Sequence, residues 1–239
     1  MFIRLIHQLT DVEWVSMIFS ALIGYLVISR MLKGDPSREQ ITDSLFKGGL
    51  ILLAIWKLSP LFLQPSMLTD SSLNLFSFLL SIGTELGYYL GVVAGVSYVI
   101  LKLRKGKIPK DKFAVVFPFG LLSTFTLFFL MTRNIGTETD LFWGVSVDQS
   151  VYKYHPIGVY QLIFGVLTGA FLFLRKRKGT PVPFRTFLVW FSLGQMVLTL
   201  VQFTIPFFAG FSLQQIFYLS VAGLLILLPM SKLEGKRVS

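Results

Sequence analysis

Residues 156–178 read PIGVYQLIFGVLTGAFLFLRKRK, in which 19 residues without a charge are followed by four consecutive basic residues. An α-helix of about 20 mainly apolar residues crosses the hydrocarbon core of a bilayer. Lys and Arg directly after such a run are typical of its cytoplasmic end. The stretch therefore predicts a membrane-spanning helix with Arg175–Lys178 on the cytoplasmic side.

The same kind of apolar run recurs along the chain. The predicted spans are residues 14–31, 45–63, 73–101, 113–131, 156–174, 186–208 and 213–230. Each reaches or approaches the length of about 20 residues that a crossing helix needs. The sequence therefore predicts an all-α, polytopic membrane protein with about seven transmembrane helices in one membrane domain, residues 1–239.

Positive charge alternates between the connections and predicts the orientation. Of the 22 basic residues, 18 lie in alternate connections and in the C-terminal tail. Only Arg4, Lys57, Arg133 and Lys153 fall on the other side. Because cytoplasmic loops retain Lys and Arg, we expect the N-terminus outside and the C-terminus in the cytoplasm.

Composition narrows the class of protein further. The chain is 54% hydrophobic, with a mean hydropathy of +0.70 and a formal charge of +10. Anionic lipid headgroups explain basic clusters at span ends, so we expect no nucleic-acid partner. The chain has no Cys and two His, and it has no nucleotide-binding, hydrolase or zinc-protease motif. We therefore expect neither a metal site nor a cofactor.

Four stretches together resemble one enzyme family. GTETDLFWGV at 136–145 resembles G-R-P-T-D-L-P-W-G-V, and HPIGVY at 155–160 is similar to H-P-S-Q-L-Y. FSLQQI at 211–216, with Gly223 beyond it, resembles the start of a last span, and PFGL recurs at 118–121. In this order and spacing they resemble the prolipoprotein diacylglyceryl transferase family over residues 12–230.

The resemblance implies a multi-pass enzyme of the bacterial plasma membrane. Such an enzyme transfers the diacylglyceryl group of phosphatidylglycerol to the lipobox Cys of a prolipoprotein signal segment and releases glycerol phosphate. The reaction needs positive donors for the phosphate and a base near the thiol. Seven spans with the N-terminus outside, which the resemblance also implies, agree with the topology read from hydropathy and charge.

Several polar positions of the family are replaced here. The family's segment R-L-G-N-F-I-N-G-E aligns with residues 125–133, where its Arg, first Asn and Glu are replaced by Phe125, Phe128 and Arg133. The His of the family's third span falls near Leu86–Tyr88 and is absent. These replacements favour an alternative, a non-catalytic membrane protein that binds lipid or a partner on the same scaffold. A small transporter is a third reading, which needs a polar path through the bundle.

Three residues are the candidates for catalysis. Glu85 is expected deep inside the third span, where an ionisable group costs about 2.5–3.5 kcal/mol on insertion scales and often marks a functional site. His155 at a span entrance could act as a base or headgroup donor, and Arg133 could bind phosphate. The structural alternatives are a hydrogen-bonded Glu, a helix-start His and an Arg that reaches from a span end to the interface.

Five more residues are expected to shape a lipid-binding pocket: Gly136, Asp140, Trp143, Gly144 and Tyr160. Their alternative is a loop anchor, with Asp140 capping a turn and Trp143 at the membrane interface. We also expect hydrogen bonds between helices from the amides of Gln195, Gln202, Gln214 and Gln215.

Overall fold

The computed structural model describes residues 13–63, 83–132, 134–147 and 151–227, and it is mainly helical. Seven α-helices and three short strands occur in these ranges. The first part of the predicted third span, 73–82, lies outside the described residues.

The chain divides into two compact units, which are described separately. Unit 1 comprises Met1–Gly24 and Phe117–Ser239, and unit 2 comprises Tyr25–Val116. Two helices, α2 (Glu13–Met31) and α6 (Lys110–Met131), run from one unit into the other.

Unit 2 is built on a pair of closely packed helices. Helix α3 (Arg38–Leu63) lies against α5 (Glu85–Arg104). A Cβ added at Gly91 would lie 2.7 Å from the backbone oxygen of Leu52, and one at Gly95 would lie 2.6 Å from that of Gly48. Glycines therefore let the two backbones touch, as small residues do at helix interfaces in membranes.

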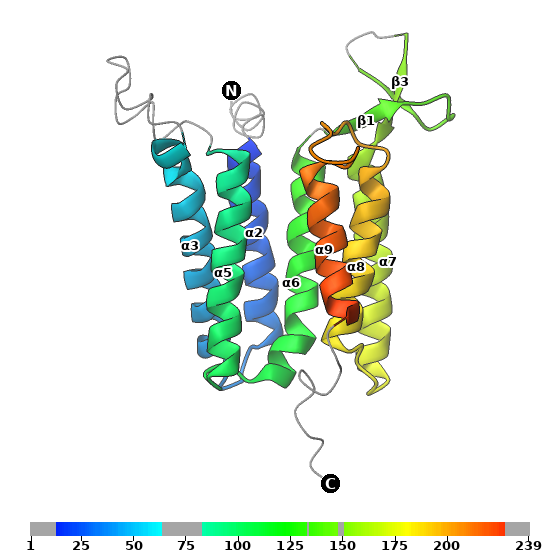
Figure 1. Ribbon diagram of the computed structural model, residues 1–239. Helices are drawn as coiled ribbons and strands as arrows, with labels where there is room; N and C mark the ends of the chain where they lie inside the picture. The colour runs from blue at the N-terminus through cyan, green and yellow to red at the C-terminus, as the bar shows by residue number, and fades with distance from the viewer. Residues whose placement is uncertain (1–12, 64–82, 133, 148–150, 228–239) are drawn as a thin grey trace, which may run out of the picture. The chain divides into compact units, whose positions relative to one another are not determined.

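Unit 1 contains the remaining helices and the strands (Figure 1). Helix α7 (Ile157–Arg177) packs on α8 (Phe184–Thr199), and α8 packs on α9 (Leu213–Leu227). A buried core joins Leu122 of α6, Leu172 of α7, and Phe187 and Phe191 of α8. Strands β1 (Ile135–Glu138), β2 (Val145–Ser146) and β3 (Lys153–Pro156) form an antiparallel sheet in the order β1-β3-β2.

The predicted membrane character agrees with the helices. Among the described residues, α3, α5, α6 and α7 are long and apolar enough to cross a membrane. The mainly helical fold is therefore confirmed, while the seven spans and their orientation stay predictions. The small sheet is an addition that the all-α prediction did not include.

Helix α8 differs from the predicted sixth span. It ends at Thr199, although the apolar run continues to Phe208. Pro206 cannot donate a helical hydrogen bond, and Ala209 and Gly210 adopt positive φ angles of 49° and 81°. The end of the run is thus a loop and not a helix.

Candidate functional site

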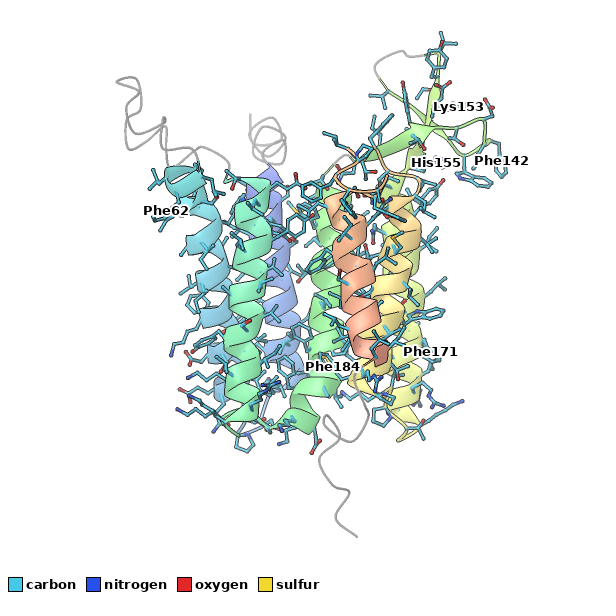
Figure 2. The ribbon with its side chains drawn as sticks, viewed as in Figure 1. Phe62, Phe142, Lys153, His155, Phe171 and Phe184 are labelled. Carbon is cyan, nitrogen blue, oxygen red and sulfur yellow. The ribbon has the colours of Figure 1, made fainter. Side chains whose placement is uncertain are left out.

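The sheet and the turn beside it hold most of the predicted site residues. The backbone N–H of Thr139 donates to the Lys153 oxygen at 2.8 Å, which joins the 136–145 stretch to β3. The N–H of Gly144 then donates to the Leu141 oxygen at 3.0 Å, which closes a turn with Phe142 and Trp143 at its centre. Figure 2 shows Phe142 at the tip of this loop and His155 where β3 approaches α7.

Three predicted residues meet at one atom. The indole Nε1–H of Trp143 donates to Tyr160 Oη at 2.7 Å, and His155 Nδ1 lies 3.0 Å from the same oxygen. We call Trp143, His155 and Tyr160 the Tyr160 cluster. It joins the end of the 136–145 stretch to the start of α7, so the two stretches form one site.

The hydrogen bonds leave the Tyr160 cluster two protonation patterns. When Tyr160 donates to His155 Nδ1, the neutral imidazole carries its proton on Nε2 and can donate there. When Nδ1–H donates to Oη instead, Nε2 is a free base and the phenol hydrogen can point to a ligand, because Oη accepts two hydrogen bonds. The cluster can therefore supply a donor, or a base together with a donor.

Two glycines give the site its close packing. A Cβ at Gly136 would lie 2.0 Å from the Val201 oxygen and 2.9 Å from His155 Cβ. At Gly144, a Cβ would come within 2.8 Å of Lys153 Cβ. All three distances are shorter than real Cβ contacts, so larger residues would displace the strands that position His155.

Asp140 lies between β1 and the turn, and its side chain does not cap the turn. The side chain that accepts from the Leu141 N–H, at 3.2 Å, is that of Thr139, so the predicted capping role of Asp140 is wrong. Asp140 instead lines a hollow of about 190 Å³ together with Glu138, Thr139, Val151, Tyr152 and Lys153. The hollow therefore presents the carboxylates of Glu138 and Asp140 and the ammonium group of Lys153.

Glu85 occupies a different setting from the predicted one. It is the first residue of α5 in unit 2, it is exposed, and Thr84 caps the helix by accepting from the Gly87 N–H at 3.0 Å. A carboxylate in the first turn is stabilised by the helix dipole. The expectation that Glu85 lies deep within a span is therefore wrong, and Arg133 lies outside the described residues.

Buried amides form a second polar feature of unit 1. Gln161 and Gln195 are each 1% exposed, and their amides exchange two hydrogen bonds of 2.8 and 3.0 Å. The interhelical role predicted for Gln195 is thus confirmed, whereas its partner Gln161 was missed. Its signal was an amide near the start of the otherwise apolar run 156–174.

Gln215 has a local role that differs from the predicted interhelical one. Its Oε1 accepts from the Ser212 N–H at 2.9 Å, and its own N–H donates to Ser212 Oγ at 3.2 Å. This reciprocal pair is a capping box at the start of α9. The Ser-x-x-Gln spacing of residues 212–215 was the signal for it.

Within the described ranges, no three His, Asp or Glu side chains gather as metal ligands would. Polar contacts at the Tyr160 cluster come from imidazole, phenol and indole groups, which suit hydrogen bonding and proton transfer.

No protein-family model matches the chain, and no curated protein matches it significantly.

Proposed function

We propose that this chain is a multi-pass protein of the bacterial plasma membrane that transfers diacylglyceryl from phosphatidylglycerol to a prolipoprotein lipobox Cys. The observation that carries the proposal is the Tyr160 cluster. Trp143 comes from one stretch that resembles the transferase family, and His155 and Tyr160 come from another. Their meeting at one phenol oxygen is what a shared headgroup site needs.

The proposed reaction places a proton-transfer demand on the cluster. The lipobox sulfur attacks the terminal glyceryl carbon of the lipid, the bond from that carbon to the phosphate oxygen breaks, and glycerol phosphate leaves. The thiol proton goes to a base, for which His155 Nε2 is the candidate when Nδ1–H donates to Tyr160. The freed phenol hydrogen can then donate to a phosphate oxygen.

Other residues have supporting roles in this proposal. Arg133 is proposed to bind the phosphate, because a guanidinium presents paired donors to its oxygens. Gly136 and Gly144 permit the close packing around His155 and the turn, and Asp140 lines the neighbouring hollow. Glu85 has no role in this proposal, since it belongs to unit 2 and its exposed place at the start of α5 suits a helix-end role.

The test is transfer in liposomes. Purified protein is mixed with phosphatidylglycerol vesicles and a lipobox peptide, and mass spectrometry detects a diacylglyceryl increment on the peptide Cys. We expect His155→Gln to lower the rate about 100-fold through loss of the base. Tyr160→Phe should lower it about tenfold, because the phenol oxygen that bonds both Trp143 and His155 is lost.

Tyr98→Phe is the matched control, because Tyr98 lies on α5 in unit 2 and its ring faces Lys102. This variant should keep the wild-type rate. If wild type gives no increment beside an active full-motif enzyme, the transferase proposal fails.

A second candidate is a non-catalytic protein that binds phospholipid on the same scaffold. The observation that favours it is aromatic packing at Phe125, where the family resemblance places an Arg. The Phe125 ring meets Phe191 edge-on, with centroids 5.0 Å apart, and it also contacts Phe129. Phosphatidylglycerol binding without transfer would support this second function.

A further inference from the structure

The connection between α8 and α9 is a hairpin without charge. No Asp, Glu, Lys or Arg occurs from Thr186 to Ser231. In the hairpin, the N–H of Phe207 donates to the Phe211 oxygen at 2.8 Å, and the N–H of Phe211 donates to the Phe208 oxygen at 2.9 Å. Ala209 and Gly210, both at positive φ, form its two-residue turn, as type I′ turns require.

The hairpin presents large apolar side chains that stay exposed among the described residues. Ile205 is 88% exposed and Phe207 is 71% exposed, and Phe203 and Phe208 are similarly open. A contiguous apolar surface of this kind on a loop indicates contact with another apolar phase. The lack of charge along the whole segment makes lipid acyl chains the matching partner.

Helix length points to the same partner. Helix α8 has 16 residues and is therefore about 24 Å long, short of the hydrocarbon thickness of about 30 Å. Its first turn carries Arg185, and the basic run Arg175–Lys178 lies shortly before it. Its other end continues directly into the uncharged hairpin. The uncharged hairpin thus supplies the apolar length that α8 alone lacks.

Backbone pairing ties this hairpin to the sheet. The N–H of Thr137 donates to the Val201 oxygen at 2.9 Å, and Gly136 pairs with Gln202 as an isolated bridge. The rings of Tyr154 and Phe203 also meet, with centroids 6.4 Å apart. In Figure 1 the connection lies below β1 at the end of α8 and α9. The depth of the hairpin therefore sets the depth of the sheet and of the Tyr160 cluster.

We propose that the hairpin Phe203–Phe211 inserts among the acyl chains of the leaflet on the sheet side. Its own backbone hydrogen bonds reduce the cost of leaving water, and its side chains provide the apolar contact. The insertion holds the Tyr160 cluster at headgroup depth. It rests on the membrane location of the chain and does not depend on the transferase reaction.

The absence of Cys allows a direct measurement of depth. Ile205→Cys and Phe207→Cys are labelled separately with a nitroxide and reconstituted in phosphatidylcholine–phosphatidylglycerol vesicles. Power saturation then compares collisions with oxygen, which concentrates in acyl chains, and with a water-soluble nickel chelate. We expect both labels to collide several-fold more with oxygen than with nickel.

The matched control is Val151→Cys, because Val151 is 94% exposed on the same unit but is flanked by polar segments. Its label should favour nickel. Labels at 205 and 207 that respond like the one at 151 would place the hairpin in water and overturn the proposal. Shielding from both reagents would indicate a protein partner and would overturn it equally. Circular dichroism of each variant shows that the helices are retained.

Discussion

The helix pairs α3–α5 and α7–α8 hold together in different ways. In α3–α5, glycines bring one backbone against the other, at Gly91 and Gly95. In α7–α8, two buried amides exchange hydrogen bonds above a phenylalanine core. The first contact depends mainly on close packing, although Thr84 at the start of α5 also donates two hydrogen bonds to Ser59 Oγ of α3. The second contact depends on a reciprocal pair of amides, and it belongs to the unit that also holds the Tyr160 cluster.

The shape-dependent contact should be the more easily broken. Gly91→Val places a Cβ 2.7 Å from the Leu52 oxygen, a backbone atom that cannot move away. We expect the free energy of unfolding to fall by about 3 kcal/mol, at the upper end for overpacking. Unfolding of the purified protein in mixed micelles, followed by circular dichroism, measures it.

Gly49→Val on the partner helix α3 is the control, since among the described residues no atom outside its own stretch of helix lies within 4 Å of its added Cβ. It carries the same helix-propensity cost. Equal losses in the two variants would show that α3–α5 does not depend on close backbone approach.

The amide pair should respond less, and in a coupled way. Gln161→Leu or Gln195→Leu leaves one buried amide without its partner, and we expect each to cost about 1–2 kcal/mol. The double variant removes both unsatisfied groups and should cost less than the sum of the two. A double-mutant cycle on unfolding free energies measures this coupling. Strict additivity would contradict the reciprocal pair.

A smaller effect is expected at the Tyr160 cluster. Trp143→Phe keeps an aromatic ring in the turn but removes the N–H that donates to Tyr160 Oη at 2.7 Å. We expect phosphatidylglycerol affinity in nanodiscs to fall about fivefold, equivalent to about 1 kcal/mol for one hydrogen bond. Trp190→Phe, an exposed position on α8, should change nothing. Unchanged affinity on losing Trp143 would remove the indole from the headgroup site.

The smallest effect concerns a surface ion pair in unit 2. Lys112 Nζ lies 2.6 Å from an Asp35 carboxylate oxygen, and with Ser37 it lowers the pKa of Asp35 from 3.8 to about 2. A lowered pKa gives stability that is present above pH 4 and lost as the pH falls toward 2.

Asp35→Asn should therefore lower the melting temperature slightly at pH 6, and the difference from wild type should vanish near pH 2. Glu39→Gln, in the first turn of α3, serves as the control for removing a nearby negative charge. If Asp35→Asn and wild type differed in melting temperature by the same amount from pH 6 to pH 2, the result would contradict a stabilising ion pair.

Helices were predictable here because long uncharged runs leave few alternatives. Hydropathy could not separate an apolar helix from an apolar hairpin, so the run 186–208 read as one span. Pro206 and the Ala209-Gly210 turn were the local signals of the change. Likewise, Gly83-Thr84-Glu85 carried the signature of a helix start, which places Glu85 at a helix end.

The residues of the candidate site could be proposed from the sequence, but the contacts that join them could not. Trp143 and Tyr160 were both expected near a pocket, yet their meeting depends on a turn and a sheet formed by short strands. Strands of two to four residues carry little periodic signal. The reciprocal pairing of Gln161 with Gln195 depends on how α7 packs against α8, which neither run of sequence specifies alone.

The indole–phenol contact also gives the molecule an optical reporter. Trp143 is one of four tryptophans and is partly exposed, so its emission wavelength depends on the water around it. With Trp14, Trp56 and Trp190 replaced by Phe, the remaining tryptophan fluorescence would come from Trp143 in the Tyr160 cluster. A lipid headgroup that displaces water there would shift the emission to shorter wavelength, so occupancy can be followed in unlabelled vesicles.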